Sequence, residues 1–198
     1  MQDVSDVFIV DGSRTPFLKA SGYSNWLSAT DLAVAAVVPL LTRQPFASTD
    51  LDEVVVGCVA PAATEANIAR IIALRSHCGN QVPAWTVQRN CASGLQALDS
   101  GAMSIRLGQH NLVLAGGVEA MSHIPWLVNK KFVDWVSDWQ TSKTWSQKLK
   151  LIAKLRPGYL VPTIALLQGL TDPVINMTMG QTAEKLAGIF AISRQDMD

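Results

Sequence analysis

The sequence predicts an α/β fold in which a parallel-dominated sheet carries helices on both faces. Short apolar runs rich in β-branched residues alternate with segments of helical periodicity, which is typical of parallel sheets. Glycines bound several of these runs, and 48% of the 198 residues are hydrophobic against 16% charged, which is enough to bury a core. We therefore expect the element order βαβαβαβ over residues 1–125.

Four apolar runs are expected to be strands, at residues 7–10, 53–57, 84–88 and 111–115. Helices are expected between them, because apolar side chains recur there at steps of three and four, at residues 31–43, 64–75 and 93–107. Thr30 and Asp31 are the candidate N-caps of the first helix. Pro39 is expected to bend or shorten that helix.

The regular alternation ends after Glu119. Residues 126 to about 178 hold four of the six tryptophans, and residues 139–171 carry five basic side chains and no acidic one. Helical periodicity returns at residues 180–190, but no further strand follows before Asp198. We predict that residues 126–198 form part of an inserted domain and that the fold is incomplete in this chain.

Cys91 lies in a turn at which a predicted strand ends and a predicted helix begins. Unpaired backbone N–H groups and the positive end of the helix dipole meet there, which favours a thiolate. The small residues at 92–94 leave room for a substrate, and the backbone N–H of Cys91 is placed to donate to a thioester oxygen. Cys91 is thus the candidate nucleophile, although a free cysteine is more often a buried small hydrophobe.

The other two cysteines, Cys58 and Cys78, are interpreted as structural, since one follows a strand end and the other lies near a helix end. The three cysteines form no CxxC pair and have no histidine at ligand spacing, so we predict neither a metal site nor a disulfide. A dinucleotide-binding fold is disfavoured because no GxGxxG follows the first predicted strand.

The chain carries 16 basic and 16 acidic residues, so no overall field attracts it to nucleic acid or to a membrane. No run approaches the roughly 18 apolar residues of a membrane-spanning helix. The first residues show neither a signal-peptide nor a transit-peptide pattern. We expect a cytoplasmic protein, or one already processed, that does not bind nucleic acid.

Three motifs resemble those of thiolases: residues 12–17 (GSRTPF), residues 90–94 (NCASG) around Cys91, and residues 116–122 (GGVEAMS). They follow one another in the expected order, and the related ketoacyl synthases carry a different sequence around their cysteine. The resemblance implies a thiolase-like fold of two similar α/β halves, of which this chain is the amino-terminal one with its inserted loop domain. It also implies a homodimer formed through the third strand, and coenzyme A as a substrate with no permanently bound cofactor.

Residues 142–156 and 179–184 resemble the long loop domain of the β-subunit of fatty-acid oxidation complexes. This resemblance implies cleavage of a 3-ketoacyl-CoA by coenzyme A, through an acyl-Cys91 intermediate, and a hydratase/dehydrogenase α-subunit as partner. Met179 would then line the pantetheine tunnel, or else be a core methionine at a helix start. A biosynthetic acetyl-CoA acetyltransferase uses the same nucleophile, so the direction and the acyl-chain length stay open.

Two groups that thiolases need are missing from these 198 residues. In the family, a His in a Gly-His-Pro context and a Cys before a glycine run supply the acid/base chemistry, and both lie in the carboxy-terminal half. Here His77, His110 and His123 lack that context and are interpreted as structural or surface residues, with His123 the nearest to the glycine motif. We expect the isolated chain to lack turnover, or to be a non-catalytic fragment that keeps docking surfaces.

Residues 130–171 form a basic amphipathic segment, in which aromatic and aliphatic side chains alternate with lysines. Such a segment can contact an anionic membrane or a partner protein. The alternative is that the segment only packs the loop domain on the catalytic core, with its lysines in water.

Overall fold

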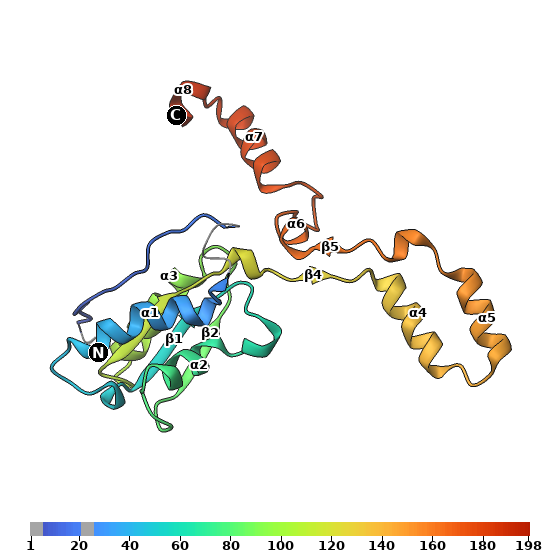
Figure 1. Ribbon diagram of the computed structural model, residues 1–198. Helices are drawn as coiled ribbons and strands as arrows, with labels where there is room; N and C mark the ends of the chain where they lie inside the picture. Colours follow the sequence, from blue (N-terminus) through green and yellow to red (C-terminus); the bar gives the residue numbers. More distant parts are fainter. Residues whose placement is uncertain (1–5, 21–25) are drawn as a thin grey trace. The chain divides into compact units, whose positions relative to one another are not determined.

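The computed structural model describes residues 6–20 and 26–198 (Figure 1). Two compact units divide the chain, Met1–Ile124 and Pro125–Asp198. The assignment of residues 1–125 to an amino-terminal thiolase domain, and of residues 126–198 to part of its loop domain, stays a prediction.

The first unit is built on a parallel sheet of three strands, β1 (Glu53–Gly57), β2 (Ala84–Val87) and β3 (Val113–Gly117). Their order is β2-β1-β3, so β1 is the central strand (Figure 1). The three consecutive valines of β1 are all buried, as a strand covered on both faces requires. The strands predicted at 53–57, 84–88 and 111–115 are thus confirmed, the last of them shifted by two residues.

Helices cover both faces of this sheet. The helices α1 (Ala29–Thr42) and α2 (Ile68–Arg75) share one buried cluster with Val54 and Val56. Side chains alternate along a strand, so Val55 and its neighbour Ala115 face the other way. There α3 (Ser93–Arg106) packs so closely that a Cβ on Gly101 would lie 3.5 Å from that of Ala115.

The three predicted helices of this unit are confirmed, but the details of the first are wrong. Ser28 is its N-cap: the Ser28 hydroxyl accepts the Asp31 N–H at 3.1 Å, and the Asp31 carboxylate accepts the Ser28 N–H at 3.0 Å. Thr30 is buried in the first turn instead. The helix also continues through Pro39 to Thr42, because the turn after the proline carries the buried core residue Leu41.

The predicted strand at residues 7–10 is wrong. Within the described part of the chain this segment pairs with no strand, and Phe8, Ile9 and Val10 are 78%, 89% and 70% exposed. An apolar run gives strand propensity, but a strand forms only where a neighbouring edge is present to pair with it. The segment is held instead by Asp11, whose carboxylate accepts two hydrogen bonds from the Arg43 guanidinium at 2.7 and 3.0 Å.

The second unit is mostly helical. Its five helices are α4 (Lys130–Thr141), α5 (Trp145–Lys154), α6 (Ala165–Gly169), α7 (Met179–Phe190) and α8 (Arg194–Met197), and its two short antiparallel strands are β4 (Trp126–Leu127) and β5 (Thr163–Ile164). Short 3-10 turns complete both units, at Ser48–Asp50, Ala63–Glu65, Met121–His123 and Pro157–Tyr159. No helix among residues 6–20 and 26–198 is long and apolar enough to cross a membrane.

The helices α4 and α5 form a hairpin (Figure 1). Three aromatic side chains stack along the inner side of α4, with ring centroids 5.9 Å apart for Phe132 and Trp135 and 5.5 Å apart for Trp135 and Trp139. The Trp135 indole donates to the Leu151 carbonyl oxygen at 2.7 Å, and the Lys148 ammonium lies 5.3 Å from the Trp139 ring centroid. The aromatic side chains of the basic amphipathic segment therefore hold the hairpin together.

Candidate active site

Cys91 lies in the turn that joins the carboxyl end of β2 to the amino end of α3. Its side chain is exposed, and α3 begins two residues later at Ser93. Asn90, just before it, has a φ of 46°, a left-handed conformation that asparagine tolerates better than most residues. The tight turn places the thiol at the carboxyl edge of the parallel sheet, where ligands of open α/β sheets commonly bind.

The Ser93 side chain closes this turn from inside. Its hydroxyl accepts the Arg89 N–H at 2.8 Å and donates to the Asn90 carbonyl oxygen at 2.6 Å. Ser93 itself is only 3% exposed. Both hydrogen bonds are partly buried, and they fix the backbone on either side of the nucleophile candidate.

Three glycines let α3 approach the sheet beneath the turn. A Cβ on Gly57, the last residue of β1, would lie 2.3 Å from the Ser93 carbonyl carbon. A Cβ on Gly117, the last residue of β3, would lie 2.8 Å from the Gly94 Cα. Any larger residue at these strand ends would push the start of α3 away.

The start of α3 presents free backbone N–H groups. In the described ranges the amides of Cys91, Gly94 and Leu95 have no hydrogen-bond acceptor, whereas the Gln96 amide donates to the Ala92 oxygen at 2.8 Å. Free amides at a helix start favour negative charge through their own dipoles and that of the helix. The turn can therefore stabilise an oxyanion formed on an acyl group attached to Cys91.

The other two thiols lie in the core. Cys58 and Cys78 are each 1% exposed. Burial, together with the nearby Glu119 carboxylate, raises the pKa of Cys58 to about 12, and burial raises the pKa of Cys78 as well. The structure thus separates one accessible thiol from two that stay protonated and enclosed.

Glu119 is a feature of this edge that sequence reasoning missed. Its carboxylate accepts the Val59 N–H at 2.9 Å and the Ala60 N–H at 3.2 Å, and the Cys58 thiol lies 3.7 Å away. The side chain therefore links the residues after β3 to those after β1. Its place two residues after the Gly116-Gly117 pair, beyond a predicted strand, was the available signal.

The three histidines and Met179 lie outside the turn that carries Cys91. His77 lies near the end of α2 with a φ of 61°, and the imidazole of His110 lies 3.8 Å from the Glu53 carboxylate, at the amino edge of the sheet. His123 ends the 3-10 turn that follows β3. Met179 is the first residue of α7 in the second unit and is half exposed, so its place in a pantetheine tunnel stays a prediction.

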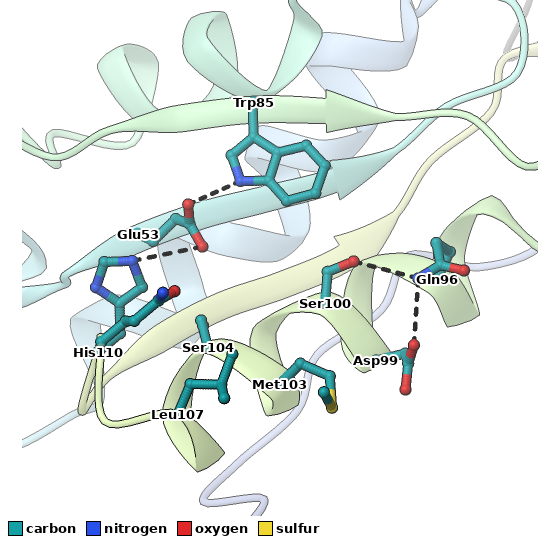
Figure 2. A pocket seen from close by; sticks show the side chains of 10 residues that line it. Glu53, Trp85, Gln96, Asp99, Ser100, Met103, Ser104, Leu107 and His110 are labelled. Atoms are coloured by element: carbon teal, nitrogen blue, oxygen red, sulfur yellow. Dashed lines mark hydrogen bonds and ion pairs between the residues drawn. The ribbon is translucent and has the colours of Figure 1, made fainter.

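A cavity of about 330 Å³ opens at the amino edge of the sheet, beside α3, away from Cys91. Figure 2 shows Glu53 between the Trp85 indole, which donates to it at 2.7 Å, and the His110 imidazole. On the helix side, Gln96 contacts Asp99 and Ser100. Neither of the predicted site residues, Cys91 and Met179, lines this cavity.

No group of three or more His, Cys, Asp and Glu side chains within the described ranges is arranged to hold a metal ion. The carboxyl edge carries an accessible thiol, Cys91, with free backbone amides around it. A thiol of this kind forms covalent intermediates with acyl groups.

The family model for "Thiolase, N-terminal domain" matches residues 7–198. The chain belongs to the thiolase family. The predicted resemblance of this chain to thiolases is thereby confirmed.

Two curated relatives of this thiolase chain match nearly all of it. The mitochondrial trifunctional enzyme subunit beta of Homo sapiens is 35% identical over 196 residues, which are 99% of this chain and 41% of that protein. The 3-ketoacyl-CoA thiolase of Yersinia pestis (strain Pestoides F) is 34% identical over 192 residues, which are 97% of this chain and 43% of that protein. The chain thus spans about two fifths of the length of the relatives it matches.

Solved thiolase structures confirm the thiolase-like α/β fold. Human mitochondrial 3-ketoacyl-CoA thiolase in complex with CoA superimposes with a TM-score of 0.72 at 28% identity, covering 93% of this chain and 42% of that one. Bacillus anthracis acetyl-CoA acetyltransferase gives a TM-score of 0.71 at 31% identity, covering 88% of this chain and 39% of that one. A ketoacyl thiolase and an acetyltransferase thus share this fold to the same degree.

Proposed function

We propose that the chain supplies the nucleophile of a thiolase-type acyltransferase, with Cys91 as the residue that carries the acyl group. The observation that supports this most directly is an exposed thiol at the start of α3, next to free backbone amides, in a member of the thiolase family. The substrates are a 3-ketoacyl-CoA and coenzyme A. Structures of two similar thiolases contain coenzyme A.

The reaction is a thiolytic cleavage in two transfers. The Cys91 thiolate attacks the 3-keto carbon, and the bond between carbons 2 and 3 breaks, so that the two-carbon piece takes a proton and leaves as acetyl-CoA. The acyl group stays on Cys91 as a thioester. The thiol of a second coenzyme A then attacks this thioester, gives up its proton, and releases a shortened acyl-CoA and the free Cys91 thiol. The free amides at the start of α3 stabilise the oxyanion of each addition step.

The proton transfers require a general base and a general acid. Thiolases take them from a His and a second Cys in the carboxy-terminal half. We therefore assign this chain the acyl-carrying part of the reaction and expect it to lack turnover alone.

The test is to incubate the purified chain with a 3-ketoacyl-CoA or with acetyl-CoA and to search for the acyl group by peptide mass spectrometry. We expect the acyl mass on the peptide that contains Cys91 and none on the peptides of Cys58 and Cys78. Cys91→Ser should remove the adduct, whereas Cys58→Ser should leave it. An adduct that persists in Cys91→Ser, or an unmodified Cys91 under conditions in which iodoacetamide alkylates it, contradicts the proposal.

A biosynthetic acetyl-CoA acetyltransferase is the second candidate, because the acetyltransferase and the ketoacyl thiolase match the chain equally well, with TM-scores of 0.71 and 0.72. The nucleophile is the same, and only the second acyl substrate differs. Acylation rates of Cys91 with acetyl-CoA and with long-chain 3-ketoacyl-CoA separate the two. A clear preference for the long chain supports the degradative reading.

Homodimerisation through β2 belongs to the same proposal. Within the described residues β2 is hydrogen-bonded to a strand on one side only, and its Trp85 is 38% exposed. An open strand edge is a ready template for a second strand. Sedimentation equilibrium should give twice the chain mass, and a monomer at all concentrations contradicts this part.

The second unit offers a surface for an anionic membrane. Trp145, Leu149 and Ile152 lie at helical steps of four and three along α5 and are 79%, 62% and 52% exposed. The lysines of α5 carry positive charge on the same helix, and such a helix binds where acidic lipid headgroups meet acyl chains. The α-subunit implied by the likeness to a trifunctional enzyme subunit beta is the alternative occupant.

Flotation with vesicles that contain phosphatidylserine tests the membrane surface. Replacing Trp145, Leu149 and Ile152 together by Ser should abolish binding, whereas Val133→Ser on α4, equally apolar and 53% exposed, should leave it unchanged. Absence of binding by the unmodified chain contradicts membrane contact and leaves the α-subunit as the partner to test by co-purification.

Cytoplasmic placement is the last part of the proposal. The three cysteines are free thiols, which is typical of proteins in a reducing compartment. The matched trifunctional enzyme subunit is named as mitochondrial. Fractionation of cells that express the protein distinguishes the two compartments.

A further inference from the structure

We infer that Glu119 positions the Cys91 turn, through a chain of hydrogen bonds that passes across the loop after β1. The inference rests on the proposed role of Cys91 as nucleophile. It assigns to Glu119 no contact with substrate, only the placement of the residues beside the nucleophile.

The first link joins the end of β3 to the loop after β1. Glu119 follows β3 by two residues, and its carboxylate accepts the backbone N–H groups of Val59 and Ala60 at 2.9 and 3.2 Å. Hydrogen bonds to a charged acceptor are stronger than those between neutral groups. The loop at residues 58–60 is therefore held to β3 and does not depend on its own contacts alone.

The second link joins this loop to the turn. The Gln88 side chain donates to the Val59 carbonyl oxygen at 3.3 Å, and the Cys58 N–H donates to the Val87 oxygen at 3.2 Å. Gln88 stands three residues before Cys91, between the end of β2 and the turn. The loop that Glu119 holds is thus the one on which the segment leading to the nucleophile rests.

The negative charge of Glu119 works against a nearby thiolate. A carboxylate disfavours the ionisation of a thiol close to it, as it does for Cys58, whose pKa is raised in part by Glu119. Glu119 therefore cannot favour the Cys91 thiolate through its charge. Any benefit to Cys91 must come from the hydrogen bonds. Loss of the carboxylate should therefore slow the reaction of Cys91, whereas an effect of the charge alone would quicken it.

The chain contains a matched control for this carboxylate. Asp52 precedes β1, and its carboxylate accepts the backbone N–H groups of Asn111 and Leu112 at 2.7 and 2.9 Å, just before β3. It makes the same kind of link between the same two strands, but at the amino edge. Asp52→Ala removes a comparable pair of hydrogen bonds without touching the Cys91 edge.

The experiment measures the rate of iodoacetamide alkylation at Cys91 by peptide mass spectrometry, in Glu119→Ala, Glu119→Gln, Gln88→Ala and Asp52→Ala. We expect Glu119→Ala to slow alkylation by roughly three- to tenfold, because a small misplacement of a reacting group is costly. Glu119→Gln keeps one acceptor oxygen, so its alkylation rate should lie between those of Glu119→Ala and the unmodified chain. Gln88→Ala should act in the same direction, and its effect should not add to that of Glu119→Ala, since both break one chain of contacts.

Amide hydrogen exchange on the same variants shows where protection is lost. In Glu119→Ala it should fall at residues 58–60 and at the hydrogen-bonded amides of residues 89, 92 and 93, and persist in β1. In Asp52→Ala it should fall at residues 111–112, and alkylation should be unchanged. Faster alkylation in Glu119→Ala, an equal slowing in Asp52→Ala, or full additivity with Gln88→Ala overturns the inference. If Glu119→Ala does not fold, Glu119→Gln and Gln88→Ala decide it. An unmodified chain whose Cys91 accepts no acyl group contradicts the proposed function instead.

Discussion

Gly57 and Ser93 lie in direct backbone contact: a Cβ placed on Gly57 would come within 2.3 Å of the Ser93 carbonyl carbon and oxygen. The first residue of α3 thus rests on the last residue of β1. No side chain separates the start of the helix from the end of the strand, so the position of the Cys91 turn is set by main chain against main chain.

Gly57→Ala should therefore destabilise the first unit. The nearest atoms belong to backbone, which cannot rotate away as a side chain can, so we expect a loss of about 1–3 kcal/mol in the free energy of unfolding. Urea denaturation followed by circular dichroism measures it. Gly116→Ala is the matched control, because a Cβ at Gly116 meets nothing within 4 Å. Equal stability of the two variants would show that the contact is not as close as described.

Alkylation of the folded chain should be selective among the three cysteines. At about pH 8, iodoacetamide should modify Cys91 and leave Cys58 and Cys78 untouched, because alkylation requires an accessible thiolate. The pKa of Cys58 is raised to about 12, so its thiolate forms only as the pH approaches that value. In concentrated urea all three should react at similar rates. Native labelling of Cys58 as fast as that of Cys91 would contradict this.

Asp31 should make the first unit sensitive to acid. The Arg75 guanidinium, 2.8 Å away, and the Ser28 amide hold the pKa of Asp31 below its usual value of 3.8. The stabilisation is therefore present above pH 3.8 and is lost as the pH falls through the lowered pKa. Asp31→Asn should cost about 1 kcal/mol near neutral pH, as lost helix caps do, and the difference from the unmodified chain should shrink in acid.

The control for that prediction is Asp196→Asn. Asp196 forms the same capping pair with Ser193, but in α8 at the end of the second unit. The pH dependence of amide exchange in β1 should differ from that of the unmodified chain in Asp31→Asn and should be unchanged in Asp196→Asn. A matching effect in Asp196→Asn would mean that the acid sensitivity does not arise at the cap of α1.

The 198-residue chain should acylate once and then stop. With excess 3-ketoacyl-CoA and coenzyme A, the acetyl-CoA released should not exceed one equivalent per chain, because repeated cycles require the acid/base groups that thiolases take from their carboxy-terminal half. Quenched-flow chromatography of the products measures the amount. Sustained release at rates typical of enzymes would show that the residues present complete the cycle.

Much of the first unit follows from local sequence. Three β-branched or apolar runs became the strands of the sheet, because each is flanked by a helix that covers it and by a neighbour to pair with. The segment at residues 7–10 has the same composition yet stays exposed. Propensity is a local property, whereas pairing depends on which edges the rest of the fold leaves open, and a single sequence does not state that.

Some features of the candidate site could likewise be predicted from the sequence, and others could not. The turn around Cys91 could be predicted, since a strand, small residues and a helix follow one another in the sequence. The reach of Glu119 to residues 59–60 could not, because it joins parts of the chain that only the folded sheet brings together. The hydrogen bonds of Ser93 reach only three and four residues back along the chain. The N-cap of α1 was missed for a smaller reason: Asp31, one of the two predicted caps, is the third residue of the helix and pairs with the true cap, Ser28.

The carboxylates of Asp52 and Glu119 tie opposite ends of the same two strands, one at the amino edge and one at the carboxyl edge. If β3 slid along β1 by two residues, the pleat and the buried faces would be preserved, but both carboxylates would lose their amides at once. The pair thus penalises the one misalignment that hydrophobic packing tolerates best. Together they fix the register of β1 and β3, so that Gly57 pairs with Gly117 at the carboxyl edge of the sheet.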